Sequence, residues 1–182
     1  MAEPTILSPL ARGSAPPPDA PPRPWRLSGR LLVLDPDGRL LLVHCSDPAL
    51  PALGEWWEVP GGGVHPGEDT VTAALREVAE ETGVVVPPAA VRPGRWSQET
   101  TYLWLGVRRW ARQVVHVARL DSAPAVVAAR PTADERESIL GPVWVPVGDV
   151  AGIGRTFPDD VAALLPRLLA GEHLDGGFMV WS

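Results

Sequence analysis

Residues 62–84 read GGVHPGEDTVTAALREVAEETGV and predict a glycine-containing loop that leads into a short amphipathic helix. The helix is expected to begin near Asp69, because aspartate is a favourable N-cap residue. It is expected to end at Gly83, because glycine accepts the left-handed conformation that often follows a helix. On a wheel of about 100° per residue, one face of this helix is apolar and is expected to pack on a core. The face consists of Val71, Leu75, Val78 and Ala79.

The opposite face of the predicted helix carries three carboxylates, those of Glu77, Glu80 and Glu81. Like charges at this spacing destabilise a helix by about 0.2–0.5 kcal/mol per pair. Arg76, four residues before Glu80, offsets part of the repulsion, and a divalent cation would offset more. Carboxylate oxygens suit Mg²⁺ or Mn²⁺, and glycines let the backbone come close to an anion or a metal. The stretch therefore predicts a metal site beside a phosphate-type anion.

Composition limits the kinds of partner that the chain is expected to have. Its 182 residues are 45% hydrophobic, which suits one globular domain with a sizeable core. The formal net charge is -6, so neither a nucleic-acid polymer nor a membrane is an expected partner. Cys45 is the one cysteine, and no apolar run is long enough to span a membrane, so a cytoplasmic location is expected. All 16 basic residues are Arg, so a side chain that holds a phosphate must be Arg or His.

The chain is expected to consist of a proline-rich flexible tail over residues 1–24 and one domain over residues 25–182. Turn signals between apolar runs predict several strands and a second helix, which together favour a mixed sheet sandwiched by helices. The strands are expected over residues 26–35, 39–45, 56–59, 95–107, 112–120 and 143–147, with residues 108–111 as a connection, and the second helix over residues 158–170.

Residues 62–84 resemble the Nudix box, whose pattern is Gly-x5-Glu-x7-Arg-Glu-U-x-Glu-Glu-x-Gly-U, where U is a bulky aliphatic residue. Every constrained position is matched without a gap, by Gly62, Glu68, Arg76, Glu77, Val78, Glu80, Glu81, Gly83 and Val84. The order of elements over residues 25–170 is also similar to that of Nudix domains. The resemblance implies an α/β fold, specifically a Nudix-type α/β/α sandwich with a mixed β-sheet.

The resemblance also implies a divalent-metal-dependent hydrolase that cleaves the pyrophosphate of a nucleoside diphosphate linked to another group. By position in the box, Glu77, Glu80 and Glu81 match the metal ligands of the family. Gly61 matches a glycine whose carbonyl often binds the metal, Arg76 an arginine that orients a box glutamate, and Glu68 a supporting loop glutamate. Glu77 is the first candidate for the general base, with Glu135 or Glu137 as the alternative.

Residues outside the helix are candidates for substrate binding, each beside a plainer structural interpretation. Arg30 could face the cleft or be a surface cation, and His44 could contact phosphate or simply pack. Trp56 could stack on a base or fill the core, and Gly62 offers backbone to an anion.

The identity of the substrate is left open by the sequence, among dNTPs, nucleotide sugars and dinucleoside polyphosphates. All three are small nucleotide-type molecules. The alternative function is a non-catalytic Nudix module that binds a nucleotide or ADP-ribose and regulates a partner. The oligomeric state is also open, and a homodimer is one option because dimers are common among Nudix proteins.

Overall fold

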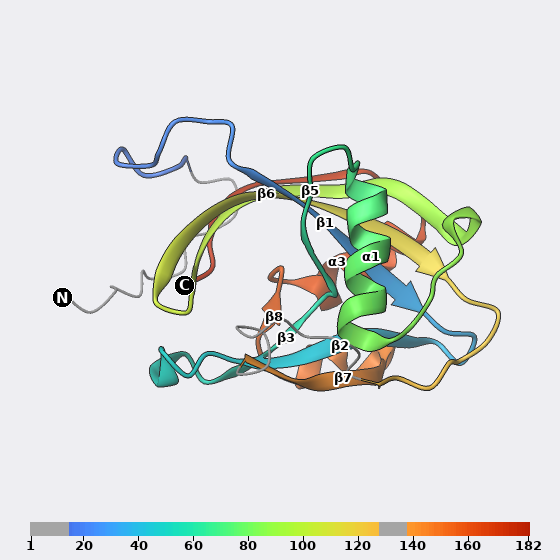
Figure 1. Ribbon diagram of the computed structural model, residues 1–182. Coiled ribbons are helices and arrows are strands. Elements are labelled where there is room, and N and C mark those ends of the chain that lie inside the picture. The colour runs from blue at the N-terminus through green and yellow to red at the C-terminus, as the bar shows by residue number, and fades with distance from the viewer. Residues whose placement is uncertain (1–14, 128–137) are drawn as a thin grey trace.

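The computed structural model describes residues 15–127 and 138–182, and within these ranges nine strands form one mixed sheet (Figure 1). Seven of them follow one another in the order β8-β3-β2-β1-β6-β5-β9, while β4 pairs with β1 and β7 pairs with β2. The strands are β1 (Arg26–Leu34), β2 (Arg39–Ser46), β3 (Glu55–Glu58), β4 (Gly61–Gly63), β5 (Val91–Trp104), β6 (Val107–Arg119), β7 (Ile139–Pro146), β8 (Thr156–Phe157) and β9 (Leu174–Val180). Three of the pairs are parallel, namely β1 with β6, β3 with β8 and β5 with β9.

Two α-helices cover opposite faces of the centre of this sheet, α1 (Thr70–Thr82) and α3 (Val161–Leu169) (Figure 1). Side chains alternate across a strand, so β1 supplies both cores. Leu31 and Val33 pack in one cluster with Ala74 and Val78 of α1, whereas Leu32 and Leu34 pack with the leucines of α3. The predicted α/β/α sandwich with a mixed sheet is confirmed. Short 3₁₀ helices lie at Pro51–Leu53, Pro88–Ala90 and Val147–Gly152.

The long hairpin of β5 and β6 turns earlier in the chain than the sequence predicts. Residues 108–111 were expected to connect the two strands, but the turn is formed by Leu105 and Gly106, with φ of 48° and 72°. Two successive residues of positive φ form a two-residue hairpin turn whose twist matches that of the flanking strands. The prediction was wrong because the first residue of the turn is a leucine. Leucine rarely adopts positive φ, so in the sequence only Gly106 indicates the turn. The shift places Arg109 inside β6, opposite Tyr102 of β5.

The end of the chain is part of the sheet. Leu174–Val180 forms β9 beside β5, and the indole of Trp181 donates to the carbonyl of Thr156 at 2.9 Å. Trp181 is buried against the edges of Trp56 and Phe157. The sequence predicts only that this apolar end belongs to the domain.

The segment before β1 contacts the sheet through Arg23 and Trp25. The guanidinium of Arg23 pairs with Glu99 of β5, and the indole of Trp25 packs 5.3 Å from the ring of Trp110. The division at residue 25 between tail and domain stays a prediction. In the described residues, no helix is long and apolar enough to cross a membrane.

The first turn of α1 lies directly on β1. Asp69 caps the helix by accepting the amide of Thr72 at 2.7 Å, and Gly83 ends it with a φ of 71°. A Cβ built on Gly29 of β1 would lie 2.0 Å from the carbonyl oxygen of Thr70. The missing side chain of Gly29 therefore sets how closely α1 approaches the sheet, and with it the position of every carboxylate on that helix.

Arg76 ties the loop before α1 to the helix. Its Nε donates to Glu68 Oε1 at 2.9 Å, and its Nη1 donates to Glu77 Oε1 at 2.9 Å and to Glu80 Oε2 at 3.0 Å. Its Nη2 reaches the carbonyl of Gly63 at 3.0 Å. These bonds raise the pKa of Arg76 and lower the pKa of Glu68 to about 2. The guanidinium of Arg76 thus holds the loop and the acidic face of α1 together.

Gly29→Ala is expected to destabilise the protein by about 1–3 kcal/mol, because the added methyl group forces α1 away from β1. Gly148→Ala is the matched control, since a Cβ at Gly148 meets nothing within 4 Å. The control should change the free energy of unfolding by less than about 0.5 kcal/mol. Denaturant unfolding of both variants measures the difference. Equal unfolding free energies for Gly29→Ala and the wild type would contradict the packing described here.

Loss of the Glu68 charge is expected to lower the stability of the folded state at neutral pH and not in strong acid. The folded-state pKa of Glu68, about 2, lies below its ordinary value of 4.5. The ion pair therefore stabilises the folded state above about pH 4.5, and this contribution is lost as the pH falls toward 2. Melting curves of Glu68→Gln and wild type, in metal-free buffer, should differ at pH 6 and converge toward pH 3. A constant difference in Tm across this range would show that the charge is not responsible.

Candidate active site

Two of the three helix carboxylates point at the glycines of β4. The amide of Gly61 donates to Glu81 Oε2 at 3.0 Å. A Cβ built on Gly62 would lie 2.4 Å from Glu77 Oε1, so only glycine leaves room for that carboxylate. Glu77 is buried, whereas Glu80 is exposed and its carboxylate accepts from Arg76. The close approach of strand and helix thus brings Glu77 and Glu81 to one place and leaves Glu80 at the surface.

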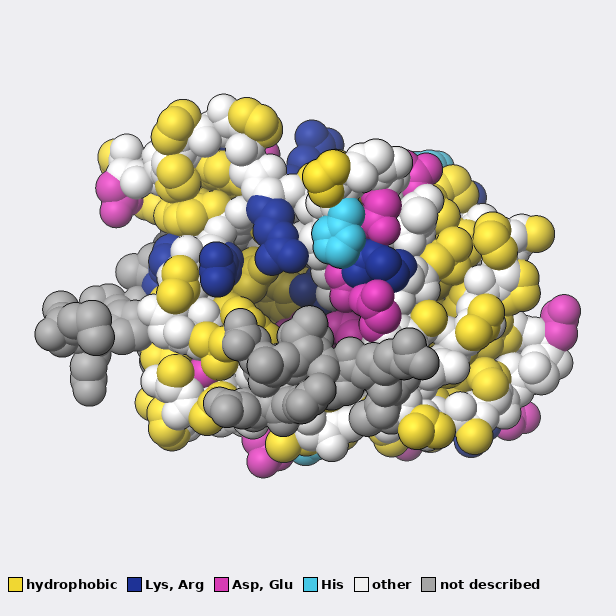
Figure 2. Space-filling view, viewed as in Figure 1, with side chains coloured by type: hydrophobic (Ala, Val, Ile, Leu, Met, Phe, Trp, Pro, Cys, Tyr) yellow, Lys and Arg dark blue, Asp and Glu magenta, His cyan; other side chains and the backbone are white. Residues whose placement is uncertain are grey.

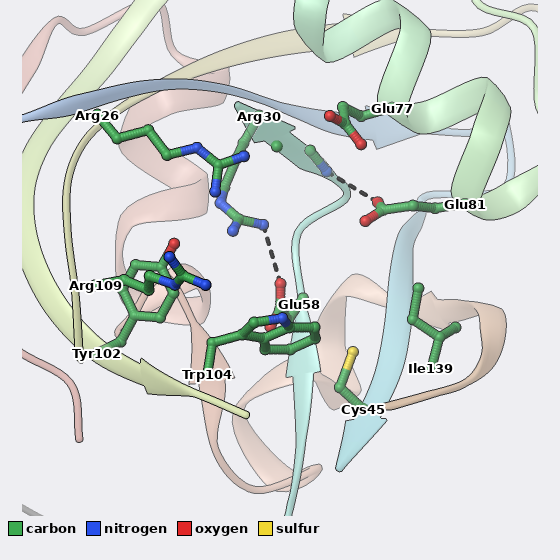
Figure 3. Close-up of a pocket in the computed structure, with 12 residues that line it drawn as sticks. Arg26, Arg30, Cys45, Glu58, Glu77, Glu81, Tyr102, Trp104, Arg109 and Ile139 are labelled. Carbon is green, nitrogen blue, oxygen red and sulfur yellow. Dashed lines mark hydrogen bonds and ion pairs between the residues drawn. The ribbon is translucent and has the colours of Figure 1, made fainter. Parts of the chain in front are cut away.

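These two carboxylates form one wall of a pocket of about 270 Å³. Figure 2 shows a hollow with acidic side chains on one side and arginines on the other, and Figure 3 shows the lining residues. The opposite wall carries three arginines from β1 and β6, and aromatic and apolar side chains complete the pocket. The lining residues are Arg26, Arg30, Cys45, Glu58, Gly61, Gly62, Glu77, Glu81, Tyr102, Trp104, Arg109 and Ile139.

Arg30 is buried at the back of the pocket and is firmly held there. Its Nη1 donates to Glu58 Oε2 at 3.1 Å and to the carbonyl of Val59 at 2.7 Å, and its Nε donates to Gln113 at 3.0 Å. Its guanidinium also lies 4.5 Å from the ring centre of Phe157. A guanidinium has five donor hydrogens, so the remaining donors can serve a ligand. Burial of this cation depends on the carboxylate of Glu58.

The acidic wall holds carboxylates close together at a buried place. Burial raises the pKa of Glu81 well above its usual range, and the nearby carboxylates of Glu77 and Glu58 raise it further. Within the described residues, no three side chains of metal-binding type come together. Two converging carboxylates nevertheless fit Mg²⁺, which is usually held by one or two carboxylates with waters and substrate phosphates. The donor set of Glu77 and Glu81 is therefore suited to a hard divalent cation.

The remaining wall is apolar and aromatic. Trp104 and Tyr102 of β5 are partly buried and pack against the cluster that contains Cys45, and Ile139 lies beside it. Burial raises the pKa of the Cys45 thiol and that of Tyr102, so both are neutral at physiological pH. This side of the pocket offers flat, uncharged surface next to the charged walls (Figure 3).

The structure gathers most of the candidate residues predicted from sequence. Glu77, Glu81, Gly61, Gly62 and Arg30 line the pocket. Arg76 and Glu68 lie beside it and hold the glycine loop on the helix. Glu80 lies outside the lining, paired with Arg76, so its predicted role as a ligand stays a prediction. The alternative bases Glu135 and Glu137 lie outside the described residues.

Two predicted substrate-binding residues do not line the pocket. Side chains of β2 alternate, so Cys45 faces the pocket and His44 points to the other side. There His44 stacks on Trp57 at 4.2 Å, and its Nε2 lies 2.9 Å from Glu55 Oε2. Trp56 is only 1% exposed, and its indole donates to Glu58 Oε1 at 2.8 Å. For both residues the plainer structural interpretation describes where the side chain lies.

Sequence reasoning missed three charged residues of the pocket. Glu58 follows Trp56 by two, so strand alternation could have indicated that it shares the side of a buried residue. Arg26 precedes Arg30 by four on the same strand, which places both on one side of β1. Arg109 carried no local signal, because only the pairing of β6 with β1 and β5 brings it to the site.

Curated relatives match only part of this chain. An RNA pyrophosphohydrolase of Dinoroseobacter shibae is 41% identical over 75 residues, which are 41% of this chain and 44% of that protein. A putative 8-oxo-dGTP diphosphatase of Bacillus subtilis is 43% identical over 53 residues, or 29% of this chain and 32% of that protein. The chain thus spans less than half the length of these relatives.

Solved structures share the fold over most of the chain. The NUDIX domain of Shewanella oneidensis NrtR, complexed with ADP ribose, superposes with a TM-score of 0.60 at 19% identity, over 81% of this chain and 90% of that one. An Ap4A hydrolase of C. elegans gives a TM-score of 0.54 at 19% identity, over 80% of this chain and 98% of that one. The family model described as NUDIX domain matches residues 25–165 of this chain. This range includes every described residue of the pocket. With the box, the sandwich and this match together, the chain belongs to the NUDIX domain family.

Proposed function

We propose that the pocket hydrolyses the pyrophosphate of a nucleoside diphosphate linked to another group, with Mg²⁺ or Mn²⁺ as cofactor. The observation that carries the proposal is the opposition of two carboxylates, Glu77 and Glu81, to three guanidiniums across one cavity. A pyrophosphate with a divalent cation would satisfy both walls at once. The names of the relatives, an RNA pyrophosphohydrolase and a diphosphatase, support the same bond as the target.

In this proposal Glu77 and Glu81 hold the cation, together with Glu80 and the carbonyl of Gly61 as the box implies. A bound divalent cation neutralises charge on the phosphates and lowers the pKa of water. Glu80 would have to leave Arg76 in order to contribute, which its exposed position permits. Mn²⁺ accepts the same oxygen ligands as Mg²⁺.

The chain's own side chains divide the remaining work. Arg30 binds phosphate oxygens with the donors that Glu58, Val59 and Gln113 leave over. Glu77 orients the attacking water and accepts its proton, while Arg76 holds that carboxylate in place at 2.9 Å. Water attacks one phosphorus and the bond from phosphorus to the bridging oxygen breaks. The two products leave as phosphate esters, or as one phosphate ester with phosphate or pyrophosphate when the substrate is a triphosphate. Trp104 offers its ring to the nucleoside side of the substrate.

The proposal is tested with a panel of (d)NTPs, nucleotide sugars, ADP-ribose and dinucleoside polyphosphates, assayed for product release in Mg²⁺ and in Mn²⁺. Glu77→Gln and Glu81→Gln are each expected to lower kcat/KM about 100-fold or more, because each removes a charged ligand or the base. Glu172→Gln is the control, since Glu172 is exposed and pairs with Arg167, and it lies outside the pocket. Full activity of both site variants would refute the assignment.

A panel without turnover would instead favour a binding module. Calorimetric binding of a nucleotide or of ADP-ribose, with no product in either metal, is the expected result for the alternative function. The homodimer and the cytoplasmic location stay predictions from sequence.

A further inference from the structure

Three guanidiniums converge on one wall of the pocket. Arg26 and Arg30 lie on β1, and Arg109 comes from β6, whose residue Ala111 pairs with Arg26 (Figure 3). Like charges that share one wall repel each other. The chain as a whole has a net charge of -6, so these three cations lie together on an acidic protein. Such a concentration of cations needs an anion to offset it.

The three arginines are not equivalent. Arg30 is paired with Glu58 at 3.1 Å, so its charge is already compensated inside the protein. For Arg26 and Arg109, the described part of the chain supplies no acidic side chain within ion-pair distance, and both residues are exposed at the pocket mouth. Two positive charges therefore remain for a ligand, beyond the one that holds the back of the pocket.

The guanidinium of Arg26 lies close to Gly63, in the loop of the Nudix box. A Cβ on Gly63 would lie 2.2 Å from Arg26 Nη2 and 2.5 Å from its Nε, so the guanidinium fills the space that a side chain at 63 would occupy. The carbonyl of Gly63 is in turn held by Arg76. Arg26 thus lies beside the same loop that carries Gly61 and Gly62.

Charge matching indicates what these two cations bind. The two phosphates of an internal pyrophosphate bring one negative charge each, and the cation site of Glu77 and Glu81 faces them. A further phosphate at the end of the chain, which ionises twice like a phosphate monoester, adds about 1.5 to 2 negative charges at pH 7. That addition equals the charge of two arginines. A neutral sugar in the same position would leave both guanidiniums without a partner.

We propose that Arg26 and Arg109 form a subsite for a phosphate beyond the anhydride that is cleaved. This subsite makes the pocket selective for nucleotides with three or more phosphates in a row over nucleoside diphosphates capped by a neutral sugar. The selectivity for turnover rests on the proposed hydrolase function. The affinity of the subsite for a longer polyphosphate does not.

The kinetic test compares substrates that share a base, namely ATP with ADP-ribose and UTP with UDP-glucose. The wild type is expected to show the higher kcat/KM on each triphosphate. Arg26→Gln and Arg109→Gln should each lower kcat/KM about 10-fold on the triphosphates and less than about 3-fold on the sugar nucleotides. The reason is that only a triphosphate loses a charge-assisted hydrogen bond in these variants. Arg26→Lys should restore part of the loss, since it keeps the charge but not the planar fork.

Arg119→Gln is the matched control. Arg119 is an exposed arginine at the other end of the same strand as Arg109, and it lines no part of this pocket. It should leave every kinetic constant unchanged. Equal losses on both substrate classes for Arg26→Gln and Arg109→Gln would overturn the proposal, as would a wild type that prefers the sugar nucleotides.

A binding measurement separates this proposal from the hydrolase function. Calorimetry with inorganic tripolyphosphate and pyrophosphate, without metal, needs no turnover. The wild type should bind tripolyphosphate about 10-fold more tightly than pyrophosphate, and each Gln variant should lose this preference. If the wild type hydrolyses nothing but shows the preference, the subsite stands and the hydrolase function fails. If it binds both anions equally, the subsite is refuted whatever the enzyme hydrolyses.

Discussion

The site depends on a close approach between the backbone of the sheet and the helix α1. At Gly29, Gly61 and Gly62 an added Cβ would overlap the helix backbone, a neighbouring strand or the carboxylate of Glu77. Protein interiors are packed so densely that an overlap with backbone, as at Gly29 and Gly61, has to move an element, whereas the overlap at Gly62 has to move the Glu77 carboxylate. The absence of these three side chains therefore fixes the depth at which Glu77 and Glu81 lie, and the pocket forms in the space that results.

Once the helix is in place, electrostatics organises the pocket. Arg76 compensates the carboxylates that face the loop, and Glu58 compensates the buried Arg30. Burial raises the pKa of Glu81, and the nearby carboxylates of Glu77 and Glu58 raise it further. The outer basic wall is without acidic partners in the described residues. Carboxylates that face guanidiniums across one pocket are the physical basis for a polyanion with a metal cation as the ligand.

The aromatic residues of the last strands support the charged ones from behind. Phe157 lies under the guanidinium of Arg30 and against Tyr102, and Trp181 packs edge-on against Phe157. Trp56, buried beside Trp181, donates to the carboxylate of Glu58. These rings are distant from one another in sequence but form one layer beneath the pocket. Trp56 thus holds the carboxylate of Glu58, and Trp181 packs against the rings of Trp56 and Phe157.

The amino-acid sequence by itself determined the family, the fold class and the acidic face of the helix. Those features depend on local spacing, such as the glutamates at 77, 80 and 81 and the caps at Asp69 and Gly83, and local spacing is legible in one dimension. The tertiary structure alone decided which carboxylates reach the pocket, that His44 and Trp56 do not, and that Arg26, Glu58 and Arg109 do. Strand alternation, the hairpin turn at Leu105 and Gly106, and the pairing of β6 with β1 set those outcomes. Strand alternation is legible in the sequence, but the pairing of β6 with β1 and β5 could not be predicted, because it depends on contacts between residues far apart in the chain, for which local propensity carries no information.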